Sequence, residues 1–131
     1  MARPRILVVD DDEAFTLLAR EFLTDAGYAV ARRLRGVEAL ATARARPPAL
    51  VLLDVRLPGL GGLAVLERLR RHPRTAAVPV LLCSACAPAE RAVWLDALAA
   101  AGVPILFKPF ALAELLARIV RLAGPPAPAP R

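Results

Sequence analysis

The sequence has few cysteines and histidines, and it lacks a long apolar run. It contains two cysteines and one histidine, and no apolar run approaches the length needed to span a bilayer. A structural zinc site needs about four ligands, and Cys83, Cys86 and His72 supply too few of the usual kind. The apolar run near the N-terminus is four residues long, which is too short for the core of a signal peptide. We therefore expect a cytoplasmic protein.

Cys83 and Cys86 have the spacing of a redox pair. A reactive pair needs a thiolate whose pKa is lowered at the start of a helix. Cys83 instead ends the apolar run at 78–83, which is typical of a buried, unreactive thiol. We favour a structural role for both cysteines over a redox role.

Lysine is almost absent. Of the 18 basic residues only Lys108 is a lysine, and with 12 acidic residues the formal charge is +6. A basic balance is compatible with a nucleic-acid partner. The arginines, however, are scattered along the chain and form no run. We attribute them mainly to composition and do not expect direct nucleic-acid binding by this domain.

Short apolar runs alternate with helical patterns along most of the 131 residues. We expect strands at 5–9, 28–34, 50–54, 78–83 and 105–107, with one helix ending at Gly27 and others at 36–46, 61–71, 88–101 and 112–123. This (βα)5 order predicts an α/β fold with a doubly wound, parallel five-stranded sheet in the order 2-1-3-4-5. We assign 1–123 to one domain and 124–131 to a disordered Pro/Ala-rich tail or truncated linker.

Helical spacing also selects core candidates. Phe15, Leu18 and neighbouring apolar residues fall on one face of the first helix. Val37 in the second helix and Leu63 in the third are expected to point into the core as well.

The most informative stretch is 50–62, in which an apolar run leads into Asp54 and then into a turn containing Pro58 and three glycines. A continuous apolar run is typical of a strand buried on both faces of a parallel sheet. Ligands of open α/β sheets bind at the carboxyl ends of the strands. Asp54 is therefore placed for chemistry.

Three other predicted strands also end in reactive side chains, which are Asp10 with Asp11, Ser84 and Lys108. In the order 2-1-3-4-5 the first and third strands are neighbours, so Asp10, Asp11 and Asp54 converge. Carboxylates this close repel unless a cation joins them, and an all-oxygen site favours Mg²⁺. With a lysine and a hydroxyl, these groups can stabilise a phosphoryl group in transfer to Asp54. The competing interpretation makes Asp11 to Glu13 simple helix caps, Ser84 a loop serine and Lys108 a solvated charge. For Asp12 and Glu13 we favour the capping role.

Four segments resemble the receiver domain of two-component response regulators, the CheY-like fold. They are ILVVDDDE at 6–13, LLDVRLPGLGG at 52–62, VPVLLCSA at 78–85 and FKPF at 107–110. Each is weak alone, but their order and spacing are specific, and the resemblance covers about 4–123.

The resemblance implies a role for each matching position around the metal. Asp54 is the expected phosphoacceptor and a Mg²⁺ ligand. Asp11 is expected to bind Mg²⁺ directly and Asp10 largely through water. The backbone carbonyl of Arg56 is expected to be a further metal ligand.

The resemblance also implies how the phosphoryl group is held. Ser84 and the backbone N–H of Ala85 are expected to bind it, and Lys108 to pair with it through a segment with a cis Lys108–Pro109 bond. The family usually has an aromatic residue three positions before this lysine, where this chain has Ile105. The usual coupling between the serine and an aromatic rotation is therefore in doubt.

The implied function is a phosphorylation-dependent signalling switch with no turnover of an external substrate. The expected donor is a histidine kinase or phosphotransfer protein, and the expected self-association surface is the face made by the fourth helix, fifth strand and fifth helix. Two alternatives remain, a docking receiver that switches little and a Mg²⁺-dependent phosphohydrolase. Haloacid-dehalogenase-type enzymes need a second aspartate where this chain has Arg56, so the phosphohydrolase ranks lowest.

Overall fold

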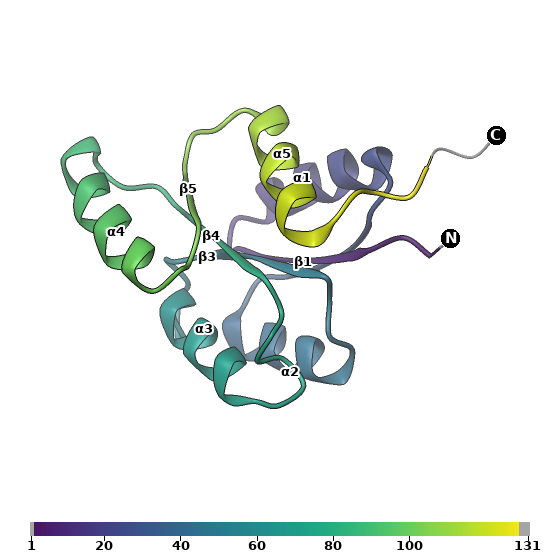
Figure 1. Ribbon diagram of the computed structural model, residues 1–131, viewed down its shortest axis with the longest axis horizontal. Coiled ribbons are helices and arrows are strands. Elements are labelled where there is room, and N and C mark those ends of the chain that lie inside the picture. Colours follow the sequence, from purple (N-terminus) through teal and green to yellow (C-terminus); the bar gives the residue numbers. More distant parts are fainter. Residues whose placement is uncertain (1, 129–131) are drawn as a thin grey trace.

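The computed structural model describes residues 2–128, in which five strands and five helices alternate (Figure 1). The strands are β1 (Arg5–Val9), β2 (Ala29–Arg33), β3 (Leu50–Asp54), β4 (Val80–Ser84) and β5 (Ile105–Phe107). The helices are α1 (Glu13–Ala26), α2 (Gly36–Ala45), α3 (Gly62–Arg71), α4 (Pro88–Ala100) and α5 (Leu112–Ala123). Every expected element is present, with ends that differ by at most two residues from the expected ones.

All strand pairs are parallel, and the sheet order is β2-β1-β3-β4-β5. This confirms the predicted doubly wound topology. Helices α1 and α5 cover one face of the sheet and α2, α3 and α4 the other (Figure 1). The central strands β1, β3 and β4 are buried on both faces, which explains why their sequences are continuously apolar.

The helices bury narrower stripes than the sequence pattern suggested. In α1 the buried residues are Thr16, Ala19 and Leu23, which lie on one line along the helix. The expectation that Leu18, Val37 and Leu63 are core residues is wrong, because these side chains are 50%, 65% and 41% exposed. Each lies beside its helix's contact line on the sheet and points toward solvent.

The segment after α5 differs from the expected unpacked tail at 124–127. The Tyr28 hydroxyl donates a 2.7 Å hydrogen bond to the Gly124 carbonyl, and the Ala127 N–H donates to the Gly27 carbonyl. Gly27 ends α1 in the left-handed region, at φ 110°, and a Cβ there would lie 2.5 Å from the Ala127 carbonyl oxygen. The segment thus returns across the start of β2, while 129–131 lie outside the described residues.

None of the helices within residues 2–128 is both long enough and apolar enough to cross a membrane.

Candidate functional site

The candidate site lies at the carboxyl edge of the sheet, where four strands deliver polar side chains. Asp10 follows β1, Asp54 and Ser84 end β3 and β4, and Lys108 follows β5. Asp10, Asp54 and Ser84 are buried although they are polar. Buried polar groups need partners, so the contacts of these side chains show how the site is organised.

Backbone amides fix the two buried carboxylates. The Arg56 N–H donates to Asp54 Oδ1 at 2.8 Å, and the Asp12 N–H donates to Asp10 Oδ1 at 2.9 Å. Both bonds form within the turn that follows each strand, so local sequence sets the orientation of the carboxylates. Asp12 itself caps α1, because its side chain accepts a hydrogen bond from the Phe15 N–H. This confirms the capping interpretation for Asp12.

Lys108 joins the two buried carboxylates. Its Nζ lies 2.5 Å from Asp10 Oδ2 and 3.1 Å from Asp54 Oδ2. Burial by itself would lower the pKa of Lys108, but the hydrogen bond and charge of Asp10 outweigh it, and the pKa is raised. Burial raises the pKa of Asp10, while Lys108 opposes that shift. The two carboxylates therefore favour the charged form of the lysine.

One lysine does not balance three carboxylates. Asp10, Asp11 and Asp54 each present an oxygen within 4.8 Å of the other two, and Asp11 is the exposed member. The cluster offers only hard oxygen donors and opens to solvent on the Asp11 side. This donor set fits Mg²⁺.

Gly62, at the start of α3, makes room directly behind Asp54. A Cβ on Gly62 would lie 2.1 Å from the Asp54 carbonyl oxygen and 2.7 Å from Val55 Cα. Both neighbours are backbone atoms, which cannot move aside cheaply. The glycine lets α3 pack against the strand end that carries the carboxylate.

The other predicted site positions lie at the same edge of the sheet and make fewer contacts with the carboxylates. Ser84 is buried, and its carbonyl accepts a 2.9 Å hydrogen bond from the Lys108 N–H. This bond ties the end of β4 to the lysine segment, in which the Lys108–Pro109 peptide bond is cis, as predicted. Ala85 follows Ser84 directly and is exposed.

Ile105 is 4% exposed and packs in the core, in register with Leu82. The aromatic residue of β5 is instead Phe107, in register with Ser84. The Arg91 guanidinium of α4 lies 5.3 Å from the centroid of the Phe107 ring. No sequence pattern pointed to this contact, because it depends on how α4 lies over β5.

Two further neighbours of the site were missed in the sequence. Lys108 Nζ lies 4.6 Å from the centroid of the Phe15 ring, which had been assigned only to the helix core. The Arg56 guanidinium lies 3.9 Å from a carboxylate oxygen of Glu90, and this contact bridges the loop after β3 and the start of α4. The position of Phe15 four residues after Asp11 was the available signal for the first contact, whereas the second had none.

Cys83 is a buried free thiol in β4, and Cys86 is a partly exposed one. Burial raises the pKa of Cys83 well above its ordinary value. A thiol that stays protonated is a poor nucleophile, which supports the structural interpretation of this residue.

The family model described as the response regulator receiver domain matches residues 6–120. The chain belongs to the response regulator receiver domains. This receiver domain carries its carboxylates, serine and lysine at the strand ends on which the sequence resemblance rested.

Several bacterial relatives are similar to this chain over most of its length. The response regulator MprA of Mycobacterium leprae is 48% identical over 117 residues, covering 88% of this chain and 49% of that protein. The DNA-binding dual master transcriptional regulator RpaA of Synechocystis is 38% identical over 116 residues, covering 88% of this chain and 47% of that protein. The chain thus spans about half the length of these relatives.

Solved structures show the same fold. The receiver domain of the sensor histidine kinase PA1611 from Pseudomonas aeruginosa has a TM-score of 0.81 at 30% identity, covering 94% of this chain and 99% of that one. That structure holds a magnesium ion in its active-site cleft. The chemotaxis protein CheY4 of Vibrio cholerae has a TM-score of 0.80 at 28% identity, covering 92% and 99% of the two chains.

Proposed function

We propose that this receiver domain takes a phosphoryl group from a histidine kinase or phosphotransfer protein onto Asp54. A carboxylate oxygen of Asp54 attacks phosphorus, the bond from phosphorus to the donor histidine nitrogen breaks, and an acyl phosphate forms. The observation that carries this proposal is the position of Asp54, a buried carboxylate held by the Arg56 N–H beside a cationic lysine and two further carboxylates.

The other residues act on charge and position. Lys108 Nζ already contacts the Asp54 carboxylate, and we propose that it pairs with the incoming phosphoryl oxygens. The Ser84 hydroxyl and the Ala85 N–H are proposed as further donors to those oxygens. Asp10, Asp11, Asp54 and the Arg56 carbonyl would hold Mg²⁺, which when bound neutralises the carboxylates and the phosphoryl group.

Intact-mass measurement after incubation with acetyl phosphate tests the acceptor site. We expect one added phosphoryl group on the wild type with Mg²⁺, and none on Asp54→Asn or in the presence of a chelator. Asp96→Asn, which removes an exposed carboxylate on α4, is the matched control and should react like the wild type. Uptake that persists in Asp54→Asn would contradict the assignment.

Mg²⁺ binding is tested separately by isothermal titration calorimetry. Asp11→Asn should weaken Mg²⁺ binding by about tenfold or more, because it removes a charged ligand while leaving the Lys108 contacts intact. Asp25→Asn, an exposed carboxylate near the far end of α1, should leave the affinity unchanged. Equal affinities in the two variants would remove Asp11 from the site.

A docking receiver that switches little is the second candidate, and the burial of Ile105 favours it. An isoleucine that is 4% exposed has no ring to turn between buried and exposed positions. Trp94, the single tryptophan, lies partly buried on α4 and provides the readout. A fluorescence change on phosphorylation supports the switch, whereas full phosphoryl uptake with unchanged Trp94 emission supports docking.

Self-association through the face formed by α4, β5 and α5 stays a prediction. Val93 and Leu95 on α4 are 71% and 48% exposed and would contribute apolar surface to such a contact. Light scattering before and after phosphorylation tests it, and a mass that does not change would contradict phosphorylation-dependent dimerisation.

A further inference from the structure

Arginines that are scattered in the sequence gather around the C-terminal half of α2 in the structure. Arg33 Nε donates to Thr42 Oγ1 at 2.9 Å, Arg74 Nε donates to the Arg44 carbonyl at 2.7 Å, and Arg5 donates to the Arg46 carbonyl. Arg68 of α3 lines a hollow of about 250 Å³ together with Arg44. We call this set the α2 arginine belt; its members are Arg5, Arg33, Arg44, Arg46, Arg68 and Arg74.

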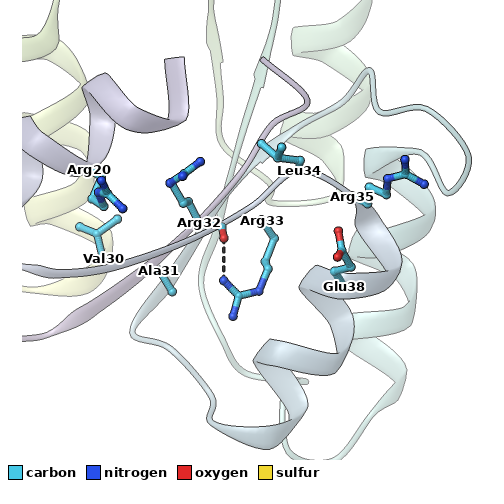
Figure 2. Close-up of a pocket in the computed structure, with 8 residues that line it drawn as sticks. All are labelled: Arg20, Val30, Ala31, Arg32, Arg33, Leu34, Arg35 and Glu38. Atoms are coloured by element: carbon cyan, nitrogen blue, oxygen red, sulfur yellow. Dashed lines mark hydrogen bonds between the residues drawn. The ribbon is translucent and has the colours of Figure 1, made fainter. Parts of the chain in front are cut away.

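The basic surface continues along β2, the edge strand of the sheet. Figure 2 shows a second hollow there, of about 620 Å³, in which Arg33 turns back so that its Nη1 bonds the Arg32 carbonyl. Arg20 and Arg35 line opposite ends of this hollow, and Glu38 is the one carboxylate among its lining residues (Figure 2). The belt therefore adjoins further guanidinium groups on this side, while beside the smaller hollow Arg71 pairs with Glu67 of α3.

The belt contains six arginines, which equals the formal net charge of the chain. None of its six arginines forms an ion pair with a carboxylate within residues 2–128. The other 12 basic residues equal the 12 acidic ones in number. Burial lowers the pKa of Arg5, and the charges of Arg46 and Arg33 lower it further. The guanidinium groups repel one another, and composition alone does not explain why they gather here.

Stabilising the helix ends explains only part of the belt. The contacts with the Arg44 and Arg46 carbonyls satisfy groups at the C-terminus of α2. A guanidinium has five N–H donors, so most of the belt's donors remain available. The Nε atoms of Arg5 and Arg44 are buried and have no partner within the described residues. The side chains of Arg46 and Arg68 make no hydrogen bond within them either.

The chemistry of the belt favours phosphate over an apolar partner. The large exposed hydrophobic residues nearest to it along the chain are Val37 and Leu63, which lie at the opposite ends of α2 and α3. A typical protein interface would need apolar area at its centre, and an amphipathic helix that inserts into a membrane would need an apolar face. Guanidinium groups match phosphate oxygens in bidentate geometry.

We propose that the α2 arginine belt binds the phosphate backbone of double-stranded nucleic acid without reading its sequence. The earlier expectation against nucleic-acid binding considered the arginines only along the chain, whereas the fold brings six of them together. Five of the six belt residues lie toward the amino edge of the sheet, and Arg33 reaches α2 from the carboxyl end of β2. Binding there does not depend on the proposed phosphoryl transfer.

Fluorescence anisotropy with a labelled 20-base-pair duplex of arbitrary sequence tests the proposal on the full chain. With up to six phosphate contacts, the logarithm of the association constant should fall with the logarithm of salt concentration with a slope of about −4 to −5. Arg46→Gln/Arg68→Gln removes two belt charges whose side chains make no internal hydrogen bond. We expect it to weaken binding about tenfold or more and to reduce the slope by about 2.

The matched control is Arg118→Gln/Arg121→Gln on α5, which gives the same net charge on the other face of the sheet. It should change affinity by less than about threefold. An equal loss of duplex affinity in both variants would show that only net charge matters and would overturn the proposal. Absence of salt-dependent duplex binding by the wild type would also overturn it. So would displacement of the duplex by polyglutamate or by anionic lipid vesicles at equal charge concentration, which would identify an acidic protein or a membrane as the partner. Phosphoryl uptake by the belt variant should be unchanged.

Discussion

The carboxyl edge of the sheet carries buried acidic groups, whereas the amino edge carries exposed basic groups. At the carboxyl edge, Asp10 and Asp54 are buried, fixed by backbone amides and bonded to one lysine. At the amino edge, the α2 arginine belt is spread over helix ends and contacts mostly carbonyl oxygens. A buried charge must have a specific partner, whereas solvent screens a spread and exposed one. Changes at the carboxyl edge should therefore cost far more stability than changes at the amino edge.

The largest difference in stability is expected between one ion pair at the carboxyl edge and one at the amino edge. Lys108→Met removes the cation from two buried carboxylates and should lower the free energy of unfolding by about 3 kcal/mol in metal-free buffer. Saturating Mg²⁺ should restore a large part of this loss. Arg71→Met breaks the exposed Arg71–Glu67 pair and should cost less than about 0.5 kcal/mol. Urea titrations with EDTA and with Mg²⁺ measure both variants. Similar losses in the two would show that buried and exposed ion pairs contribute equally to stability in this protein.

Gly62→Ala tests how tightly the carboxyl edge is packed. The added methyl group would overlap the Asp54 carbonyl at 2.1 Å, so we expect a loss of about 2 kcal/mol or more together with slower phosphoryl uptake. Gly61→Ala is the matched control, because a Cβ there meets its nearest atom at 3.9 Å. Thermal unfolding and intact-mass kinetics should separate the two variants, and equal behaviour would show that Asp54 does not depend on this contact.

At the amino edge, Tyr28→Phe removes the hydrogen bond to Gly124 and should cost about 1 kcal/mol. Burial raises the pKa of Tyr28 above its ordinary 10.0. In the unfolded chain the phenol ionises first, so the stability due to the neutral phenol is present below pH 10 and is lost as pH rises above it. The difference between wild type and Tyr28→Phe should therefore shrink in alkaline buffer. Denaturant titrations at neutral and alkaline pH check this, and a constant difference would contradict it.

The smallest effect is expected in the belt itself. Arg46→Gln should raise the free energy of unfolding by a few tenths of a kcal/mol at low salt, because it relieves repulsion with Arg5. The gain should vanish at high salt, whereas Arg118→Gln should show none. A destabilised Arg46→Gln protein would mean that the belt holds the fold together.

The carboxyl edge could be predicted from the sequence because each part is local. An apolar strand followed by an aspartate places that carboxylate at a sheet edge, and parallel topology brings Asp10, Asp11 and Asp54 together. The amide that holds Asp54 lies two residues further along the chain. Residues close together in the sequence therefore determine most of the geometry of this site.

The features that were missed depend on how separate elements pack. Arg91 reaches Phe107, and Arg56 reaches Glu90, only because α4 lies over β5 and the loop after β3. The belt needs side chains from two strands, two helices and two loops. Leu18 and Leu63 were misassigned because helical periodicity shows which residues share a face but not how wide a stripe the sheet covers.

Lys108 also makes the folded chain unusually simple to probe. It provides the only side-chain amine of the sequence, and this amine is held by Asp10 and Asp54. Apart from the terminal α-amine, a reagent that acylates amines would therefore label one internal position. The extent of labelling there would follow how firmly the carboxylates hold the ammonium. Acylation would also remove the site's only lysine charge. Because the chain has a single lysine, the extent of side-chain acylation would measure the accessibility of this one site.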